Sequence, residues 1–434
     1  MKCAIGIDLG STTTKAIILS EEGQIVGRGL TNSRSDYTVA ARIAQGEAYT
    51  NARFQLLGSV LHAEADSGTS GFLKRLHARF RFEQIHEHYR SLRELCLTEL
   101  SERDPGEEAR ETAAEIFANM DRKLGEHIES FGDDESLFFR DVAGSLYMRE
   151  AEEVCRKRHT SFDSFVGLYD KAILLVENQL LDQSFRDCAE AALSAVIEEG
   201  QDEASFSEAI AEVSEVEFDV LATIGTGYGR LTLPFEKEQI SSEILCHGLG
   251  AHFMFPGTRT VLDIGGQDMK AIQVDENGIV DSFQMNDRCA AGTGRYLGYI
   301  ADELNLGLHQ LGPMASQSSR PTKISSTCTV FAGTEFREKL ALGHRREDIL
   351  AGLHRAIILR AMSLLARSGG IRQEFTFTGG VAKNEAAVAE LRKLVHENYG
   401  EDIVLNIHSD SIYTGAVGAA LFALRQSRSK GEAA

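Results

Sequence analysis

The stretch that decides the fold is Asp8-Leu9-Gly10-Ser11-Thr12-Thr13-Thr14-Lys15, and a related stretch, Asp263-Ile264-Gly265-Gly266-Gln267-Asp268-Met269-Lys270, follows about 255 residues later. In both, an apolar run ends at an aspartate, a glycine follows within two residues, and a lysine stands seven positions after the aspartate. Both continue through a polar turn, SEEGQIV or DENGIV, into another apolar segment. The pattern predicts a strand, a glycine turn, a second strand and a further hairpin, occurring twice.

These glycine turns point to a site for phosphate groups. A tight turn leaves backbone N–H groups and Ser or Thr hydroxyls free to surround phosphate oxygens. An aspartate at the end of the leading strand can hold a metal ion, directly or through its water. Two such turns facing each other would grip a nucleotide's phosphates from both sides. The alternative is two ordinary β-hairpins, since Asp-x-Gly turns are common.

A third segment, Phe375 to Asn384 (FTFTGGVAKN), has an apolar strand, the pair Gly379-Gly380 and a predicted helix start. A glycine pair lets the backbone pass close to a flat base or a ribose. Alone this signal is weak, but it follows two predicted phosphate turns. The chain has no G-x-x-x-x-G-K-[ST] motif, so the P-loop class is excluded.

Composition separates a body from an insertion. The chain has 434 residues and a net charge of −20, of which residues 71–220 carry 17 basic and 35 acidic side chains. The same stretch holds only 7 of the 40 glycines, and its apolar residues recur at three- and four-residue steps. This predicts amphipathic helices with acidic outer faces, inserted into a near-neutral, glycine-rich body. Helices of this kind most simply present a solvated face, although a large insert also offers a surface for partner subunits.

The overall composition limits compartment and partners. An acidic chain argues against nucleic acid as the main partner. No window approaches the roughly 18 uninterrupted apolar residues that a membrane span needs, and the first residues do not have the pattern of a signal peptide. Seven cysteines without scaffold spacing indicate a reducing compartment. We therefore expect a cytoplasmic protein without a membrane partner.

Two cysteines share a context. Cys289 lies in FQMNDRCAAGTGRYLGYIADEL and Cys328 in ISSTCTVFAGTEFREKLALG, and apolar residues follow each at helical spacing. A thiol at or just before a helix N-terminus has a lowered pKa. Because a 4Fe–4S cluster usually takes four thiolates, two cysteines per chain suggest a cluster shared between two subunits. The alternative is that both are small core residues, as we predict for Cys3, Cys96, Cys155, Cys188 and Cys246.

The repeat and the third segment resemble the superfamily of acetate and sugar kinases, heat-shock chaperones and actin. The resemblance implies an α/β fold, a duplicated ribonuclease-H-like domain that binds ATP between its halves, here with an inserted helical domain. It places the first half in residues 1–60 and 218–258, with helix 411–426 packing back on it. The insertion would span residues 61–217, and the second half, with both cluster cysteines, residues 259–410.

Longer strings, LDIGGQDMKAI, FQMNDRCAAGTGRYL, ISSTCTVFAGTEF and FTGGVAKN, resemble the activator ATPases of 2-hydroxyacyl-CoA dehydratases and the ATP-binding subunits of benzoyl-CoA reductases, the BadF/BadG/BcrA/BcrD type. The resemblance implies that Cys289 and Cys328 hold a 4Fe–4S cluster together with a second, homologous ATPase subunit. It assigns Mg²⁺ and water positioning to Asp8 and Asp263, and orientation of the water to Gln267.

The resemblance also implies which residues surround ATP or ADP. The first phosphate turn would be Gly10, Ser11, Thr12, Thr13 and Lys15; the second Gly265, Gly266 and Asp268; and the adenosine would be lined by Gly379, Gly380, Val381 and Asn384. Each glycine could instead be a structural turn residue. Lys15 and Lys270 could be exposed strand residues, and for Lys270 we favour that interpretation.

The length favours the larger ATP-binding subunit of a benzoyl-CoA reductase over a compact activator. Such a subunit would take electrons from ferredoxin, and ATP turnover would drive them to the subunits that bind and reduce the CoA ester. An activator of a 2-hydroxyacyl-CoA dehydratase is the alternative. A small-molecule kinase of the same superfamily is a more distant one.

Overall fold

The computed structural model describes residues 1–33, 36–61, 67–102, 106–126, 139–179, 184–198, 202–231, 235–286, 292–304, 306–325 and 329–432. They form two compact units, one of Met1–Tyr49 with Phe218–Ala434 and one of Thr50–Glu217.

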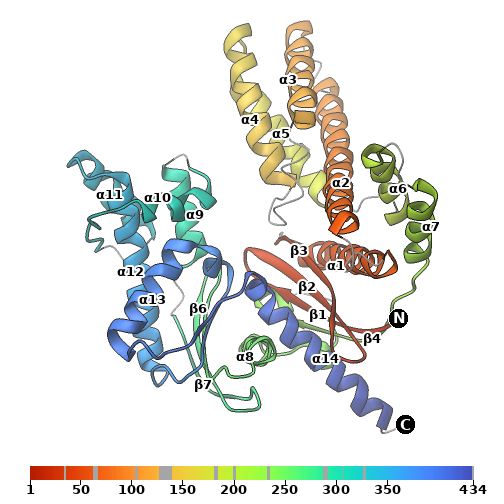
Figure 1. Ribbon diagram of the computed structural model, residues 1–434. Helices are drawn as coiled ribbons and strands as arrows, with labels where there is room; N and C mark the ends of the chain where they lie inside the picture. The colour runs from red at the N-terminus through yellow and green to blue at the C-terminus, as the bar shows by residue number, and fades with distance from the viewer. Residues whose placement is uncertain are drawn as a thin grey trace. The chain divides into compact units, whose positions relative to one another are not determined.

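The first unit contains two mixed sheets (Figure 1). The first sheet has the order β3-β2-β1-β4, with β1 Lys2–Leu9, β2 Thr13–Ser20, β3 Ile25–Asn32 and β4 Asp219–Thr226. The second has the order β7-β6-β5-β8-β9, with β5 Thr260–Ile264, β6 Met269–Val274, β7 Val280–Met285, β8 Phe375–Thr378 and β9 Leu405–Asn406. In both sheets three antiparallel strands adjoin a parallel one. The predicted α/β class and its duplication are confirmed.

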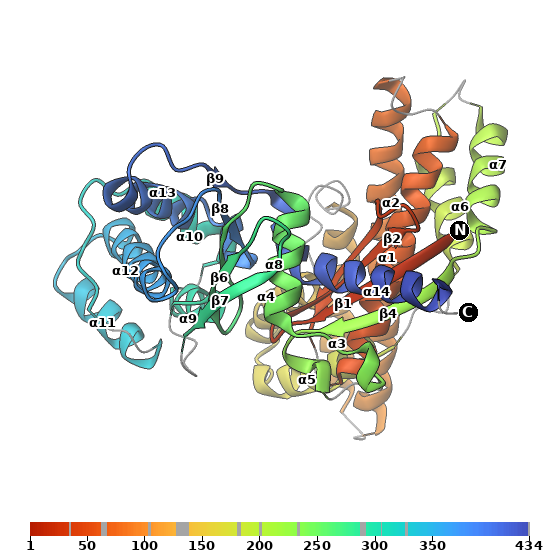
Figure 2. The ribbon, with the colours of Figure 1, turned by 90° about the horizontal axis from the view of Figure 1, so that it is seen from below.

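Two helices join the halves of this unit. Helix α14 (Thr414–Glu432) packs on β1 and β4 of the first sheet, and α8 (Glu243–Met254) packs on β6 and β7 of the second. The two helices pack on each other, and Figure 2 shows them side by side. Glycines permit the close approach, since a Cβ on Gly418 would lie 1.9 Å from the carbonyl oxygen of Cys246. The α8–α14 contact therefore joins the two sheets.

The second half of the unit has its own apolar core. Its helices are α9 Gly294–Glu303, α10 Leu311–Ser316, α11 Thr329–Ala341, α12 Arg346–Arg367 and α13 Glu385–Tyr399. Their apolar faces cover the sheet around Phe375 and Phe377, both fully buried. Among the described residues α12 alone is long and apolar enough to cross a membrane; 56% of its 18-residue window is buried, and it packs in this core.

The second unit is helical in its described residues. Its helices are α2 Ser67–Glu102, α3 Glu107–Glu126, α4 Phe139–Arg158, α5 Phe162–Glu177, α6 Phe185–Val196 and α7 Glu203–Ser214. Helix α1 (Tyr37–Val60) enters it from the first sheet. Helices α2 to α5 enclose one apolar core, and α2, α6, α7 and the end of α1 enclose another. The predicted helical character of the acidic insert is confirmed.

Candidate functional site

The seven-residue spacing of the repeat is a cross-strand pair. Asp8, near the end of β1, lies opposite Lys15 of β2, and Asp263 of β5 lies opposite Lys270 of β6. In each pair the lysine Nζ is 3.3 Å from the aspartate Oδ2. Each half of the first unit thus has a buried aspartate–lysine ion pair next to its glycine turn.

Lys270 corrects the sequence interpretation. We expected an exposed strand residue, but the residue is 1% exposed. Its ammonium lies 2.6 Å from Asp268 Oδ1 and 2.9 Å from Glu243 Oε1, in addition to Asp263. Burial would lower the pKa of Lys270, but the three carboxylates outweigh burial and raise it above its ordinary value. Glu243 comes from α8, so sequence spacing alone did not reveal this partner.

Asp263 is equally enclosed. The Thr378 hydroxyl donates to its Oδ1 over 2.9 Å, and Nδ1 of His247 lies 3.5 Å from the same oxygen. Burial raises the pKa of an acid, but the charges of His247 and Lys270 and the Thr378 bond hold the pKa of Asp263 at about 2. The carboxylate is therefore ionised at neutral pH and available to a cation.

The two glycine turns approach each other closely. A Cβ on Gly266 would lie 1.9 Å from Thr12 Oγ1, although their positions in the chain are far apart. A side-chain N–H of Arg295 donates to the Ser11 carbonyl over 3.2 Å, and the backbone N–H of Arg295 donates to the Gly266 carbonyl over 2.9 Å. The structure therefore brings the predicted first and second phosphate turns together.

Ser33 organises the first turn and was missed from sequence. Its hydroxyl donates to the Gly10 carbonyl over 2.5 Å and lies 3.0 Å from Thr14 Oγ1, while its N–H donates to the Thr12 carbonyl. Thr12 is exposed and Thr13 half-buried. With its carbonyls held by Ser33, this turn can direct its remaining polar groups outward.

The second turn holds Gln267 and Asp268. Both are half-buried, and the Asp268 carbonyl accepts from the Gly265 N–H over 3.0 Å. The Asp268 side chain pairs with Lys270, so it shapes the turn around that cation. Gln267 lies in the same turn, between Gly266 and Asp268, and its role in orienting the water stays a prediction.

The third segment reaches the same region. Gly379 follows β8 with φ +89°, and a Cβ there would lie 2.4 Å from the Ile264 carbonyl oxygen. A Cβ on Gly380 would meet no atom within 4 Å. The side chain of Val381 is buried in the core, so only the backbone of Val381 can face a nucleotide. Asn384 caps α13 by accepting from the Ala387 N–H over 3.0 Å, after a 3₁₀ turn that replaces the predicted direct helix start.

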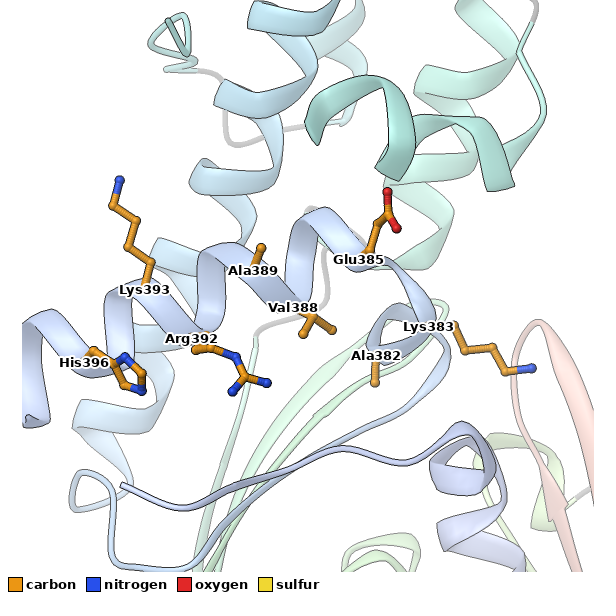
Figure 3. A pocket seen from close by; sticks show the side chains of 8 residues that line it. All are labelled: Ala382, Lys383, Glu385, Val388, Ala389, Arg392, Lys393 and His396. Carbon is orange, nitrogen blue, oxygen red and sulfur yellow. The ribbon is translucent and has the colours of Figure 1, made fainter. Parts of the chain in front are cut away.

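A pocket of about 620 Å³ adjoins this segment. It begins at Ala382 and Lys383 and runs along α13 past Val388 and Arg392 to His396 (Figure 3). Figure 3 shows Arg392 and His396 on the same side of the helix. The pocket therefore continues from the predicted adenosine segment and carries cationic side chains.

Cys289 and Cys328 lie outside the described residues, so the structure does not show their side chains. The helices that follow them, α9 and α11, pack on each other: a Cβ on Gly333 would lie 2.7 Å from the Tyr299 hydroxyl, and Arg337 pairs with Glu303. Tyr296, Leu297 and Ile300 face the core as the helical spacing predicted, but Phe331 is 68% exposed. The two cysteine segments thus precede neighbouring helices.

The remaining predicted cysteine roles agree with the structure. Cys3, Cys96, Cys155, Cys188 and Cys246 are free and buried. Burial raises the pKa of Cys246 to about 11, which keeps it a neutral thiol. In the described part of the chain, His, Cys, Asp and Glu form no group of three that could hold a metal ion. A Mg²⁺ ion at the glycine turns would then depend on one or two carboxylates, water and phosphate oxygens, as is usual for that ion.

A family model described as "BadF/BadG/BcrA/BcrD ATPase family" matches residues 5–423. The (R)-2-hydroxyglutaryl-CoA dehydratase activating ATPase of Acidaminococcus fermentans is 41% identical over 51% of this chain and 82% of its own length. One of the subunits of the benzoyl-CoA reductase of Thauera aromatica is 34% identical over 47% of this chain and 71% of its own length. Both alignments span most of the relative but about half of this chain, so this chain holds much additional sequence.

The fold is shared with a solved protein. The activator of 2-hydroxyisocaproyl-CoA dehydratase from Clostridium difficile, determined with bound ADPNP, has a TM-score of 0.55 at 22% identity, and the match covers 100% of this chain and 98% of that one. The fold class predicted from the repeat is confirmed. Among the named relatives, dehydratase activators outnumber benzoyl-CoA reductase subunits.

Proposed function

The chain belongs to the BadF/BadG/BcrA/BcrD ATPase family, and from this premise we propose that it spends ATP to drive electrons into a partner enzyme that acts on CoA esters. The observation that carries the proposal is the link between the second glycine turn and α9. Gly294 and Arg295, at the start of α9, donate backbone bonds to the carbonyls of Gly265 and Gly266, each over 2.9 Å. The Thr293 hydroxyl also donates to the Gly266 carbonyl. A phosphate bound at this turn would thereby act on the segment that carries Cys289.

ATP with Mg²⁺ would bind where the two glycine turns meet. The backbone N–H groups and hydroxyls of the turns suit phosphate oxygens, and Asp8 and Asp263 suit the cation and the attacking water. Four carboxylates, those of Asp8, Asp263, Asp268 and Glu243, face the ammonium groups of Lys15 and Lys270 and the imidazole of His247. This excess of negative charge favours a divalent cation. The ADPNP bound by the Clostridium difficile relative supports the nucleotide assignment.

Cys289 and Cys328 would hold half of a 4Fe–4S cluster, with two cysteines of a second chain supplying the other half. When bound, such a cluster supplies a one-electron centre. The packing of α9 on α11 supports the assignment, because one cysteine precedes each of these two neighbouring helices in the sequence. The chain's own contribution would be one cysteine before each of the two helices, of which α9 bonds to the second glycine turn.

The partner enzyme we infer first is a 2-hydroxyacyl-CoA dehydratase. The chain length favoured a benzoyl-CoA reductase, but identity is 41% to the dehydratase activator against 34% to the reductase subunit. Identity across the shared ATPase is the more direct measure, because an inserted unit changes length without changing the site. The reductase remains the second candidate, since the helical unit of Thr50–Glu217 offers a surface for further subunits.

An anaerobic reconstitution tests this proposal. The purified chain is mixed with reduced ferredoxin, the expected cytoplasmic electron donor, and with ATP and either a 2-hydroxyacyl-CoA dehydratase or the CoA-ester-binding subunits of a benzoyl-CoA reductase. We expect ATP-dependent product formation with the dehydratase, and none when ADPNP replaces ATP. ATP hydrolysis that never supports either partner, together with phosphorylation of a small molecule, would instead establish a kinase.

A further inference from the structure

His247 lies between the two acid–base pairs of the ATPase. It is 6% exposed and projects from α8, the helix that also supplies Glu243 to Lys270. Its Nδ1 lies 3.5 Å from Asp263 Oδ1, on the second sheet. A Cβ on Gly415 would lie 2.9 Å from its Nε2 and 3.1 Å from Asp8 Oδ2, so the same small gap borders His247 and the acid of the first sheet.

The imidazole is not a satisfied core residue. Within the part of the chain that the structure describes, Nδ1 makes no hydrogen bond of normal geometry, and 3.5 Å exceeds the usual 2.7–3.2 Å. An unpaired nitrogen in the interior costs free energy that an apolar side chain would avoid. The unpaired Nδ1 faces Asp263 Oδ1, and the Nε2 borders the gap at Gly415 that the Asp8 carboxylate also borders.

The surrounding packing fixes the ring in this place. The backbone of α14 approaches α8 through Gly418, whose Cβ would lie 1.9 Å from the Cys246 carbonyl oxygen, one residue before His247. Gly415 of α14 leaves room for the ring, and any larger residue there would meet it. The ring can therefore be held at this position without a strong hydrogen bond.

We propose that His247 is a positioning residue of the ATPase, holding Asp8 and Asp263 in a fixed relation where the two halves of the first unit meet. It would act through these carboxylates on the bound cation and water rather than contact the reacting atoms. The inference rests on the proposed role of Asp8 and Asp263 at the nucleotide. Helix α8 would then contribute two residues to the site. Glu243 pairs with Lys270, and His247, one helical turn later, lies next to Asp263.

The test compares His247→Ala and His247→Gln with His252→Gln. His252 is a matched control, since it is a histidine on the same helix that faces the hairpin at Gly278. For His247→Ala we expect kcat of ATP hydrolysis to fall about 10–100-fold, as for groups that orient catalytic carboxylates. The KM for ATP should change by less than about threefold, because the loss concerns the transition state more than binding. His247→Gln, which retains a polar group, should recover part of the rate, and His252→Gln should match the wild type.

Several outcomes would overturn the proposal. One is a kcat for His247→Ala within about twofold of the wild type, measured on folded protein. Another is an equal fall of kcat in His247→Ala and His247→Gln that is matched by an equal fall in their unfolding temperatures. If His247→Ala does not fold, His247→Gln and Gly415→Ala carry the test, because each alters the contact with the carboxylates. Asp8→Asn and Asp263→Asn are measured alongside. If Asp8→Asn and Asp263→Asn retain full ATPase activity, the proposed site is wrong. If they lose ATPase activity but the His247 variants do not, only the role of His247 is wrong.

Discussion

The ammonium of Lys270 lies 3.3 Å from the carboxylate of Asp263, and both side chains are almost fully buried. Lys15 and Asp8 repeat this distance in the other half, although Lys15 retains 12% of its side-chain exposure. The repeat in the sequence therefore corresponds to the same aspartate–lysine ion pair in both halves of the unit. In the second half, the carboxylates of Asp268 and Glu243 also pair with the lysine, so the ammonium of Lys270 contacts three carboxylates.

Replacing Lys270 with Met should destabilise the first unit. The change leaves Asp263, Asp268 and Glu243 without their shared cation, and loss of one partner of a buried ion pair costs about 3–5 kcal/mol. The measurement is the free energy of unfolding in urea. The exposed Lys237→Met is the control, expected within about 0.5 kcal/mol of the wild type. A Lys270→Met variant as stable as this control would show that the pairs contribute little.

Gly266→Ala should weaken nucleotide binding while Gly265→Ala should not. A Cβ on Gly266 would meet Thr12 Oγ1 at 1.9 Å and displace it, whereas a Cβ on Gly265 meets nothing closer than 3.4 Å. Misplacing a positioning group by about 1 Å can lower a reaction rate on the order of 100-fold, and we expect the affinity for ADPNP to fall as well. The dissociation constant for ADPNP, measured by calorimetry, compares the two. Equal affinities would mean that the turns do not hold phosphate together.

Arg295→Gln should reduce nucleotide affinity with little loss of stability. The exposed guanidinium joins the turns through the Ser11 carbonyl, and removing such a solvent-accessible bond costs about 0.5–1.5 kcal/mol, or roughly two- to tenfold in affinity. The variant keeps the backbone bond to Gly266, so α9 should stay in place. Affinity for ADPNP and the unfolding temperature are measured together. Loss of stability without loss of affinity would make the bond purely structural.

His77 should make the stability of the helical unit depend on pH. Burial lowers the pKa of His77 from 6.5 to about 4. Below pH 6.5 the unfolded chain then binds a proton that the folded chain refuses, so the free energy of unfolding falls as pH drops from 6.5 towards 4. His77→Phe should show a shallower dependence over this range. The imidazole resonance followed by NMR provides a direct measurement, and titration near 6.5 would contradict the expected shift.

Much of the fold could be predicted because it depends on local pattern. The repeat from Asp8 to Lys15 and from Asp263 to Lys270 predicted two strand–turn–strand units, and the structure adds that each aspartate lies opposite its lysine. The three- and four-residue steps in residues 71–220 anticipated helices. Gly10 and the pairs Gly265-Gly266 and Gly379-Gly380 marked the turns that the structure brings together.

The supporting residues could not be predicted because their partners are distant in sequence. Glu243 and His247 lie on an apolar stretch that indicates a core helix, and only the packing of α8 on α14 turns them towards Lys270 and Asp263. Ser33 follows β3 without any motif, yet it fixes the first turn. Length favoured a benzoyl-CoA reductase, whereas most of the named relatives are dehydratase activators. An insertion changes the length of a chain without changing its ATPase.

The measurement that tests the central claim most directly is iron and sulfide per chain, with an EPR spectrum after dithionite reduction, on protein kept from oxygen throughout. We expect two irons for each copy of the chain and the signal of a reduced 4Fe–4S cluster, which the Cys328→Ser variant should lose while it still binds ADPNP. Protein without iron that nevertheless hydrolyses ATP would contradict the account and return Cys289 and Cys328 to ordinary core positions.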